Sequence, residues 1–405
     1  MNQQWNVSIT GKTEIAGIEE RIKFCDDLIN TRYESLNDFG LFTGLSGILL
    51  HKVFLWQHFK EDKYYQECET VLNRIFDLIE SEDFNDTSYC SGLAGVGLVL
   101  HYLSEKKILD IDCRSILQEI DPHIVSGLNT CLQKSFFDFL YGAIGLGIYL
   151  VETNDRGANN EYLENIIEQI YRHSKVDDYG RRLEHQEDIS DPQSIGCNLG
   201  LAHGLPAIIL FLCKCYENDI LKNETKLLAK EFIDFILTHR NDGAGATSVF
   251  PNKVSDYPPR PDRDSRLAWC YGDLGICLTL LQFAKTFDRA DILQIATDIL
   301  IVTSNRNPKT EVTPVKDPYF CHGRAGIVHL FNRGYYYTRC ELLKTAAVTW
   351  TKELYTLMES EHYTEQVKKG TERCDMLNGI AGTSLVLTSL VSDSEPFWDR
   401  FFLLS

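Results

Sequence analysis

The sequence predicts an all-α protein whose seven pairs of helices form an (α/α)7 toroid. A short glycine motif occurs seven times along the 405 residues, a strongly apolar run follows each copy, and amphipathic segments separate the copies. Self-similarity at a period of roughly 50 residues is the sequence signature of a repeat architecture. These observations together favour a helical repeat protein.

The glycine motif defines repeats 1 to 7. Its first glycine recurs at spacings of 48, 50, 62, 68, 51 and 56 residues, at Gly44, Gly92, Gly142, Gly204, Gly272, Gly323 and Gly379. A second glycine follows three residues later, except in repeat 4, where Ala207 takes its place. Small residues three apart lie on one helix face and let backbones approach closely. The apolar run after them predicts a buried inner helix.

The amphipathic segments between the motifs predict outer helices. In residues 64–83, 159–175 and 289–305 the charged residues gather on one side. Each unit is then an outer helix, a loop, a glycine and an inner helix. Seven units form either an open solenoid or a closed toroid, and closure is favoured because it buries the inner helices against one another. We expect a single domain across residues 1–405.

Two long segments interrupt this pattern. Residues 176–200 show no helical period, and residues 240–268 are rich in proline, glycine and aspartate, which predicts a loop. They precede the glycine motifs of repeats 4 and 5. Long loops before two adjacent motifs indicate a functional rim.

Composition excludes some classes of protein. The formal net charge of −18 disfavours a nucleic-acid binder, which needs a basic face. Thirteen cysteines, an odd number scattered without a Cys-x-x-Cys pair, do not form a disulfide framework and suit a reducing compartment. The first residues lack a signal-peptide pattern, and the longest apolar runs fall well short of the roughly 20 residues of a membrane span. We therefore expect a cytoplasmic protein.

Two glycine motifs carry candidate metal ligands. "WCYG" and "FCHG" place Cys270 and Cys321 two residues before the glycines of repeats 5 and 6, and His322 follows Cys321. Two thiolates and an imidazole suit zinc and leave a fourth position open, as in catalytic sites. Ordinary packing is the alternative, since buried cysteines are common. Cys90 stands at the same place in repeat 2 without a polar partner, so position alone is not diagnostic.

Three further residues are candidates for the rim. Asp138, in "FFDFLYG", is either a satisfied core acid or a perturbed acid/base group. His203, in "LAHG", is on its own more often a core histidine than a functional one. Arg266 ends the long loop before Cys270, where an exposed structural arginine is the default reading.

The glycine-led repeats with "WCYG", "CHG" and "LAHG" resemble the lanthionine synthetase C family, the lantibiotic cyclases and their relatives. The resemblance runs from Gly44 to Gly382. It implies a toroid of seven inner and seven outer helices around one zinc ion, with water as the fourth ligand, and a reduced β-rich extension at residues 176–200. The implied metal ligands are Cys270, Cys321 and His322. The implied active-site group is His203, Asp138, Arg266 and Tyr271.

The resemblance also implies a reaction. Zinc lowers the pKa of a peptide cysteine thiol, and the thiolate adds to a dehydroalanine or dehydrobutyrine of the same precursor peptide, closing a thioether ring. Arg266 is our candidate for stabilising the enolate, and His203 for protonating the α-carbon. Asp138 would orient or charge-balance them. The implied partners are a dehydrated precursor peptide, a dehydratase and an exporter, with membrane contact only through such partners and no nucleic acid.

Two alternatives differ in function. A protein prenyltransferase also combines an α/α toroid with zinc, but six repeats and an Asp-Cys-His set would favour it, against seven repeats and Cys-Cys-His here. A cyclase-like zinc protein would instead bind a thiol such as glutathione, or a protein partner, without making rings. It would keep the same zinc ligands, so this alternative stays open on the sequence.

Overall fold

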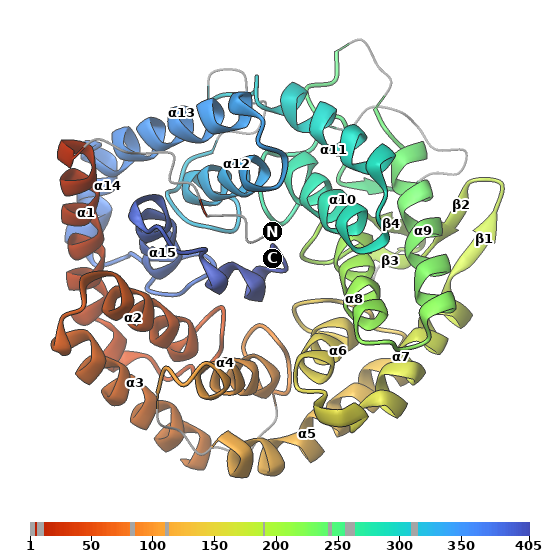
Figure 1. Ribbon diagram of the computed structural model, residues 1–405, viewed down its shortest axis with the longest axis horizontal. Helices are drawn as coiled ribbons and strands as arrows, with labels where there is room; N and C mark the ends of the chain where they lie inside the picture. Colours follow the sequence, from red (N-terminus) through yellow and green to blue (C-terminus); the bar gives the residue numbers. More distant parts are fainter. Residues whose placement is uncertain are drawn as a thin grey trace. The chain divides into compact units, whose positions relative to one another are not determined.

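The computed structural model (Figure 1) describes residues 5, 12–81, 86–109, 113–188, 191–241, 245–255, 264–308 and 315–405. Helices dominate these residues, and the strands among them are few and short. The chain divides into two compact units. Unit 1 comprises Met1–Ile124 and Val315–Leu403, and unit 2 comprises Val125–Pro314. The single domain expected over residues 1–405 stays a prediction.

An inner helix follows the first glycine of every repeat. These helices are α2 (Leu45–Phe59), α4 (Leu93–Glu105), α6 (Ala143–Glu152), α8 (Leu205–Glu217), α10 (Asp273–Phe287), α12 (Arg324–Thr338) and α15 (Ile380–Val391). The glycine is the N-cap residue of each, as the motif predicts. All seven helices are buried over most of their length. No helix in the described ranges is both long and apolar enough to cross a bilayer.

The outer helices alternate with the inner ones. They are α1 (Lys12–Asn30), α3 (Asp62–Ser81), α5 (Cys113–Gln133), α7 (Asn160–His173), α9 (Lys222–Thr238), α11 (Ala290–Thr303) and α13 (Glu341–Met358), followed by the short α14 (Glu361–Lys369). The predictions for residues 64–83, 159–175 and 289–305 are confirmed within two residues at each end.

Within each unit, inner helices pack against inner and outer neighbours. In unit 1, α15 packs against α12, α2 and α1, and α2 also packs against α3 and α4. In unit 2, α8 packs against α6, α10 and α9, while α10 packs against α11. An inner helix is thus covered on several sides, which explains why its sequence is apolar on most faces.

Short strands occupy the two segments without helical period. β1 (Lys175–Asp177) pairs with β2 (Gly180–Arg182), and β3 (His185–Asp188) pairs with β4 (Asp191–Asn198), all antiparallel. The β-rich extension expected at residues 176–200 is therefore present, apart from residues 189–190, which lie outside the described ranges. β5 (Lys253–Val254) pairs with the end of β4 and so joins the second long loop to the first. Residues 242–244 and 256–263 of that loop also lie outside the described ranges.

The loops that precede the inner helices are linked by backbone hydrogen bonds. In unit 1 the N–H of Phe42 donates to the carbonyl of Cys90 at 2.8 Å, Leu377 donates to Phe42 at 3.1 Å, and Cys321 donates to Leu377 at 2.9 Å. Each of these four residues stands two positions before the first glycine of its repeat. The sequence equivalence of Cys90 and Cys321 is therefore also a structural equivalence.

The second glycine of a repeat makes this loop contact possible. A Cβ atom at Gly95 would overlap the carbonyl oxygen of Tyr89 and lie 2.7 Å from the Cβ of Leu41, in the loop of repeat 1. A Cβ at Gly47 would lie 2.8 Å from the Cβ of Met376, in the loop of repeat 7. These separations are too short for any side chain, so the motif needs glycine in order to seat one loop on the next.

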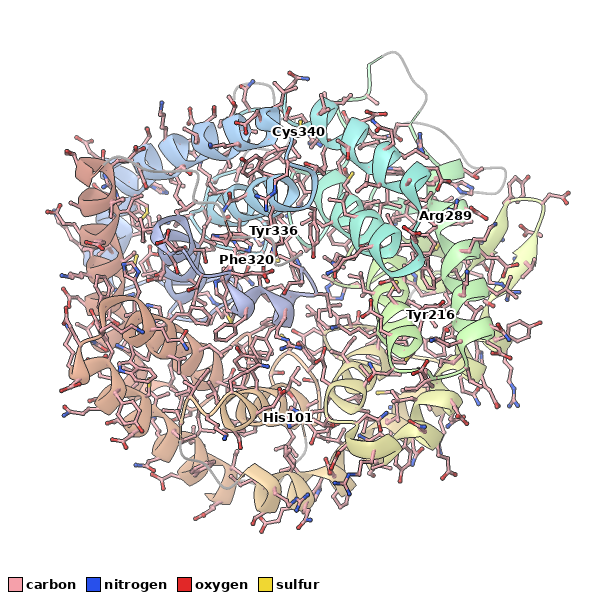
Figure 2. All side chains as sticks on the ribbon, viewed as in Figure 1. His101, Tyr216, Arg289, Phe320, Tyr336 and Cys340 are labelled. Atoms are coloured by element: carbon pink, nitrogen blue, oxygen red, sulfur yellow. The ribbon has the colours of Figure 1, made fainter. Side chains whose placement is uncertain are left out.

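The C-terminal segment supports the loop of repeat 6 in unit 1. Phe320, labelled in Figure 2, packs against two aromatic residues of the 3₁₀ helix Phe397–Phe402. Its ring centroid lies 4.0 Å from that of Phe402 and 5.5 Å from that of Trp398. The buried Asp399 of this helix accepts hydrogen bonds from Arg333 and lies 2.7 Å from Nε2 of the buried His329. These contacts fix Phe320, the residue before Cys321.

Substituting the second glycine tests the close approach of loops. We expect Gly95→Ala to destabilise the protein by about 1–3 kcal/mol, because the added methyl group overpacks the contact with the neighbouring loop. Gly17→Ala, in α1, is the matched control, since its Cβ would meet only Arg21 at 3.5 Å. Relief of glycine's backbone entropy should make the control about 0.5–1 kcal/mol more stable. Thermal melts with equal losses for both variants would contradict the contact.

Candidate active site

Cys270 is the metal-ligand candidate of unit 2. It lies in the loop before α10, its side chain is buried, and its carbonyl accepts a hydrogen bond from the N–H of Ala202 at 3.3 Å. Ala202 stands two residues before Gly204, so this is the same loop-to-loop bond that links Phe42 with Cys90 in unit 1. The backbone of Cys270 is thus held by the repeat pattern itself.

Cys321 and His322 are the candidates of unit 1. The N–H of Cys321 is held by Leu377, and Nε2 of His322 lies 3.8 Å from Oδ2 of Asp317. The other oxygen of Asp317 accepts the N–H of Tyr319 at 3.0 Å. A carboxylate near a ligand histidine orients the imidazole and raises its basicity. Sequence reasoning missed Asp317, although its place six residues before Gly323 matches Asp38 and Asp86 in their repeats.

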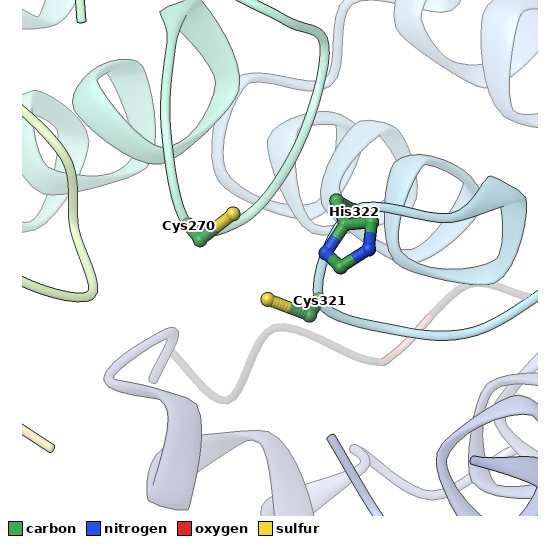
Figure 3. A group of neighbouring side chains, drawn as sticks. All are labelled: Cys270, Cys321 and His322. Carbon is green, nitrogen blue, oxygen red and sulfur yellow. The ribbon is translucent and has the colours of Figure 1, made fainter. Parts of the chain in front are cut away.

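Figure 3 draws the three candidate ligands, Cys270, Cys321 and His322, which we call the Cys/His cluster and which together offer two sulfur atoms and one imidazole nitrogen. Two thiols and an imidazole are donors that zinc prefers, and three protein ligands leave a position for a substrate. The residues present therefore fit zinc.

His203 and Asp138 form a close pair in unit 2. Nδ1 of His203 lies 2.6 Å from Oδ2 of Asp138. Burial lowers the pKa of His203, but the hydrogen bond and charge of Asp138, together with the charge of Cys270, outweigh burial and raise it above its usual value. The pair therefore favours the protonated imidazolium. Its Nδ1 faces the carboxylate of Asp138, and its Nε2 carries the second proton.

The second oxygen of Asp138 has a structural task. Oδ1 accepts the N–H of Tyr141 at 2.8 Å, three residues on, as Oδ1 of Asp375 does with Asn378 in repeat 7. One oxygen of this aspartate therefore folds the loop and the other meets His203, and its role in catalysis stays a prediction. The turn fixes the carboxylate before any substrate arrives.

Tyr271 joins the pair through Asn198, the last residue of β4. The side-chain amide of Asn198 donates to the Tyr271 hydroxyl at 3.0 Å, and the tyrosine and His203 rings are 6.4 Å apart. A Cβ at Gly200 would lie 2.6 Å from the Tyr271 ring, so only glycine allows this approach. Sequence reasoning missed Asn198 and Gly200, because their roles depend on a ring 71 or more residues away.

Arg266 lies close to the same group. It is partly exposed, and its charge opposes a rise in the pKa of Tyr271 that burial chiefly causes, with Cys270 and Asp138 adding to the rise. The structure therefore brings Asp138, His203, Tyr271 and Arg266 into one electrostatic neighbourhood with Cys270, all within unit 2.

A cavity of about 170 Å³ opens beside the His203–Asp138 pair. Phe136, Leu205 and Ile208 form an apolar part of its lining, and Glu184, from the link between β2 and β3, adds a second carboxylate. Lysine and arginine are absent from the described residues that line it. Its two carboxylates outnumber the imidazolium of His203, so the cavity suits a neutral or cationic peptide segment better than an anion.

Comparison with known proteins assigns the family. The family described as "Lanthionine synthetase C-like protein" matches residues 35–403. The nisin biosynthesis protein NisC of Lactococcus lactis subsp. lactis is 26% identical over 407 residues, covering 91% of this chain and 90% of NisC. The glutathione S-transferase LANCL1 of Danio rerio is 21% identical over 342 residues, covering 82% and 76%.

A solved structure shows the fold. The structure of nisin cyclase matches with a TM-score of 0.74 and 19% identity, covering 97% of this chain and 98% of that one. This match confirms the predicted fold class, an all-α toroid of paired helices. The family match spans nearly the whole chain and agrees with the glycine-led repeats. The chain therefore belongs to the lanthionine synthetase C-like family.

Proposed function

We propose that this protein is a zinc-dependent peptide cyclase that forms lanthionine or methyllanthionine rings in a dehydrated precursor peptide. One observation carries the proposal: a histidine–carboxylate pair and a tyrosine converge on Cys270. A site that only held a thiol would need the metal ligands alone. Ring formation also needs a proton donor, and His203 with its raised pKa supplies one.

The metal's contribution is simple. Cys270, Cys321 and His322 would hold zinc, which lowers the pKa of a bound peptide thiol and makes it a better nucleophile at neutral pH. The position without a protein ligand would receive that thiol. Asp317, near His322, would orient the imidazole.

Side chains of the protein would stabilise the negative charge of the enolate and supply the proton that the α-carbon receives. When the substrate sulfur bonds to the β-carbon, the electrons of the carbon–carbon double bond move toward the amide carbonyl as an enolate. The guanidinium of Arg266 would stabilise that oxygen. Nε2 of His203 would give its proton to the α-carbon, while Asp138 holds Nδ1 and stabilises the imidazolium beforehand.

The competing function is thiol binding without ring formation. The similarity to LANCL1, a glutathione S-transferase, favours it. Glutathione is a net anion with two carboxylates and one ammonium group, however, and the described lining of the cavity sets the carboxylates of Asp138 and Glu184 against the imidazolium of His203. The peptide reading is therefore preferred. We propose in addition that a dehydratase supplies the substrate and an exporter removes the product.

Metal analysis of two cysteine variants tests the ligand set. We expect about one zinc per chain in the wild type and loss of most of it in Cys321→Ala, because a ligand is removed. Cys90→Ala is the matched control: it stands at the same place in its repeat but outside the Cys/His cluster. Equal zinc content in Cys321→Ala and the wild type would reject the assignment.

The role of His203 is tested by activity and pH together. His203→Ala should keep zinc but lose cyclisation by roughly 10²–10⁴-fold, the usual worth of a general acid. Because the active form is protonated, wild-type activity should fall as pH rises through the raised pKa of His203. Asp138→Asn removes two of the interactions that raise this pKa, so its alkaline limb should move to lower pH. An unmoved limb would show that another group donates the proton.

The substrate class is tested by counting thiols. A peptide with one dehydroalanine and one cysteine should lose its free thiol on incubation with the zinc-loaded protein, with no change in mass. Incubation of the same peptide with glutathione and the protein is the competing arm. A mass gain equal to one glutathione, without ring closure, would replace the cyclase proposal by the transferase one.

A further inference from the structure

In six repeats the loop before the inner helix contains a turn in which a side-chain oxygen accepts a nearby backbone N–H. Repeat 5 lacks this turn at the two equivalent positions, both of which the structure describes. In four repeats the residue six before the first glycine is Asp or Asn, and its side chain accepts the N–H two residues on: Asp38, Asp86, Asn198 and Asp317. Repeats 3 and 7 use Asp138 and Asp375, four before the glycine, in a similar way. In repeat 5 these two positions hold Arg266 and Ala268, which cannot accept such a bond.

The backbone of repeat 5 differs as well. Gly272 has φ of +90°, whereas the first glycines of the other six repeats have φ between −100° and −140°. Only glycine adopts a positive φ of this kind without strain. The loop that carries Arg266 and Cys270 therefore follows its own path and needs another means of support.

A buried ion pair supplies that support. Asp273, the first residue of α10, is 1% exposed and accepts the N–H groups of Val249 at 3.1 Å and Phe250 at 2.9 Å. Arg306, just after α11, is 7% exposed and donates to Asp273 at 3.2 Å through Nη1. Its Nη2 donates to the carbonyl of Ser265 at 2.9 Å. One pair thus binds the loop at two places.

Ser265 is held on both sides. Its N–H donates to Oγ of Ser248 at 2.8 Å, and the same hydroxyl donates to the carbonyl of Phe250 at 3.0 Å. Its carbonyl accepts from Arg306. The peptide immediately before Arg266 is therefore fixed to the segment 248–250, which Asp273 itself holds.

We propose that Asp273 and Arg306 are positioning residues that set the place of Arg266, in the role that a side-chain turn performs in the other repeats. Because the ion pair holds the loop, position 266 does not need a turn-forming Asp or Asn. An arginine can therefore stand there. A buried ion pair contributes little net stability compared with apolar packing, so its retention points to placement rather than to stability alone. The inference rests on the proposed function, because it is for that reaction that Arg266 is needed.

A double-mutant cycle tests the link to Arg266. Asp273→Asn keeps the shape of the side chain but removes its charge, and we expect cyclisation to fall roughly 100-fold with zinc content near that of the wild type. The melting temperature should fall as well, because the buried charge of Arg306 loses its partner. In an Arg266→Ala background the same change should cost less than about twofold, because the residue it positions is gone. Equal losses in both backgrounds would overturn the inference.

Two further variants guard the test against simple unfolding. Ser248→Ala removes the hydroxyl that bonds to Ser265 and Phe250, and that also contacts Asn241 and Asp264, while Asp273 and Arg306 stay in place. It should reproduce the loss of cyclisation in milder form. Asp291→Asn breaks the exposed pair of Arg289 and Asp291 on α11 and should leave activity unchanged. If Asp273→Asn does not fold, wild-type activity in Ser248→Ala would overturn the inference.

Trypsin cleavage after Arg266 separates this inference from the proposed function. We expect Asp273→Asn to be cut there about tenfold faster than the wild type, and Asp291→Asn at the wild-type rate, because the loop is released locally. If the wild type makes no rings, the cyclase proposal fails while this measurement still decides whether the pair holds Arg266. Unchanged cleavage in Asp273→Asn would overturn the positioning role whatever the activity.

Discussion

The close approach of backbone to backbone at the start of each inner helix is the constraint on which the rest depends. Without side chains at positions such as Gly47 and Gly95, one pre-helix loop can rest on the next. That contact allows hydrogen bonds between residues two before the glycine, as between Phe42 and Cys90. The bonds satisfy backbone groups that burial would otherwise leave unpaired, so the same geometry recurs from repeat to repeat.

Because the pre-helix loops share much of their backbone geometry, their chemistry differs mainly through the side chains at equivalent positions. Cys270 and Cys321 occupy one position of the loop, two before the glycine, while His203 and His322 occupy the next. Asp138 occupies the place that Asp375 uses for an ordinary turn, and in addition contacts His203, which lies opposite. Functional sites of this kind arise by substitution on a frame that is already rigid.

The sequence was informative where a residue's role is set by its own repeat. The glycines and the apolar runs predicted the inner helices, which the structure confirms. The matching positions of Cys270 and Cys321 predicted a shared metal site, which stays a prediction. Asn198 and Gly200 could not be predicted in the same way. They read as ordinary loop residues, and their significance comes from the Tyr271 ring, which folding brings to them.

The fifth loop departs from the backbone geometry that the other repeats share. A side-chain turn is a local device whose donor and acceptor are two residues apart, so little chain entropy is lost in making it. An arginine at position 266 cannot form that turn, and the loop must then be fixed from a distance by Asp273 and Arg306. Such a pair must be buried and fully bonded to be tolerated, which explains why Asp273 accepts from two backbone amides as well as from the guanidinium. Burying the Asp273–Arg306 pair carries a desolvation penalty that a side-chain turn avoids. The pair is therefore expected only where the residue at position 266 does something that a turn-forming Asp or Asn cannot do.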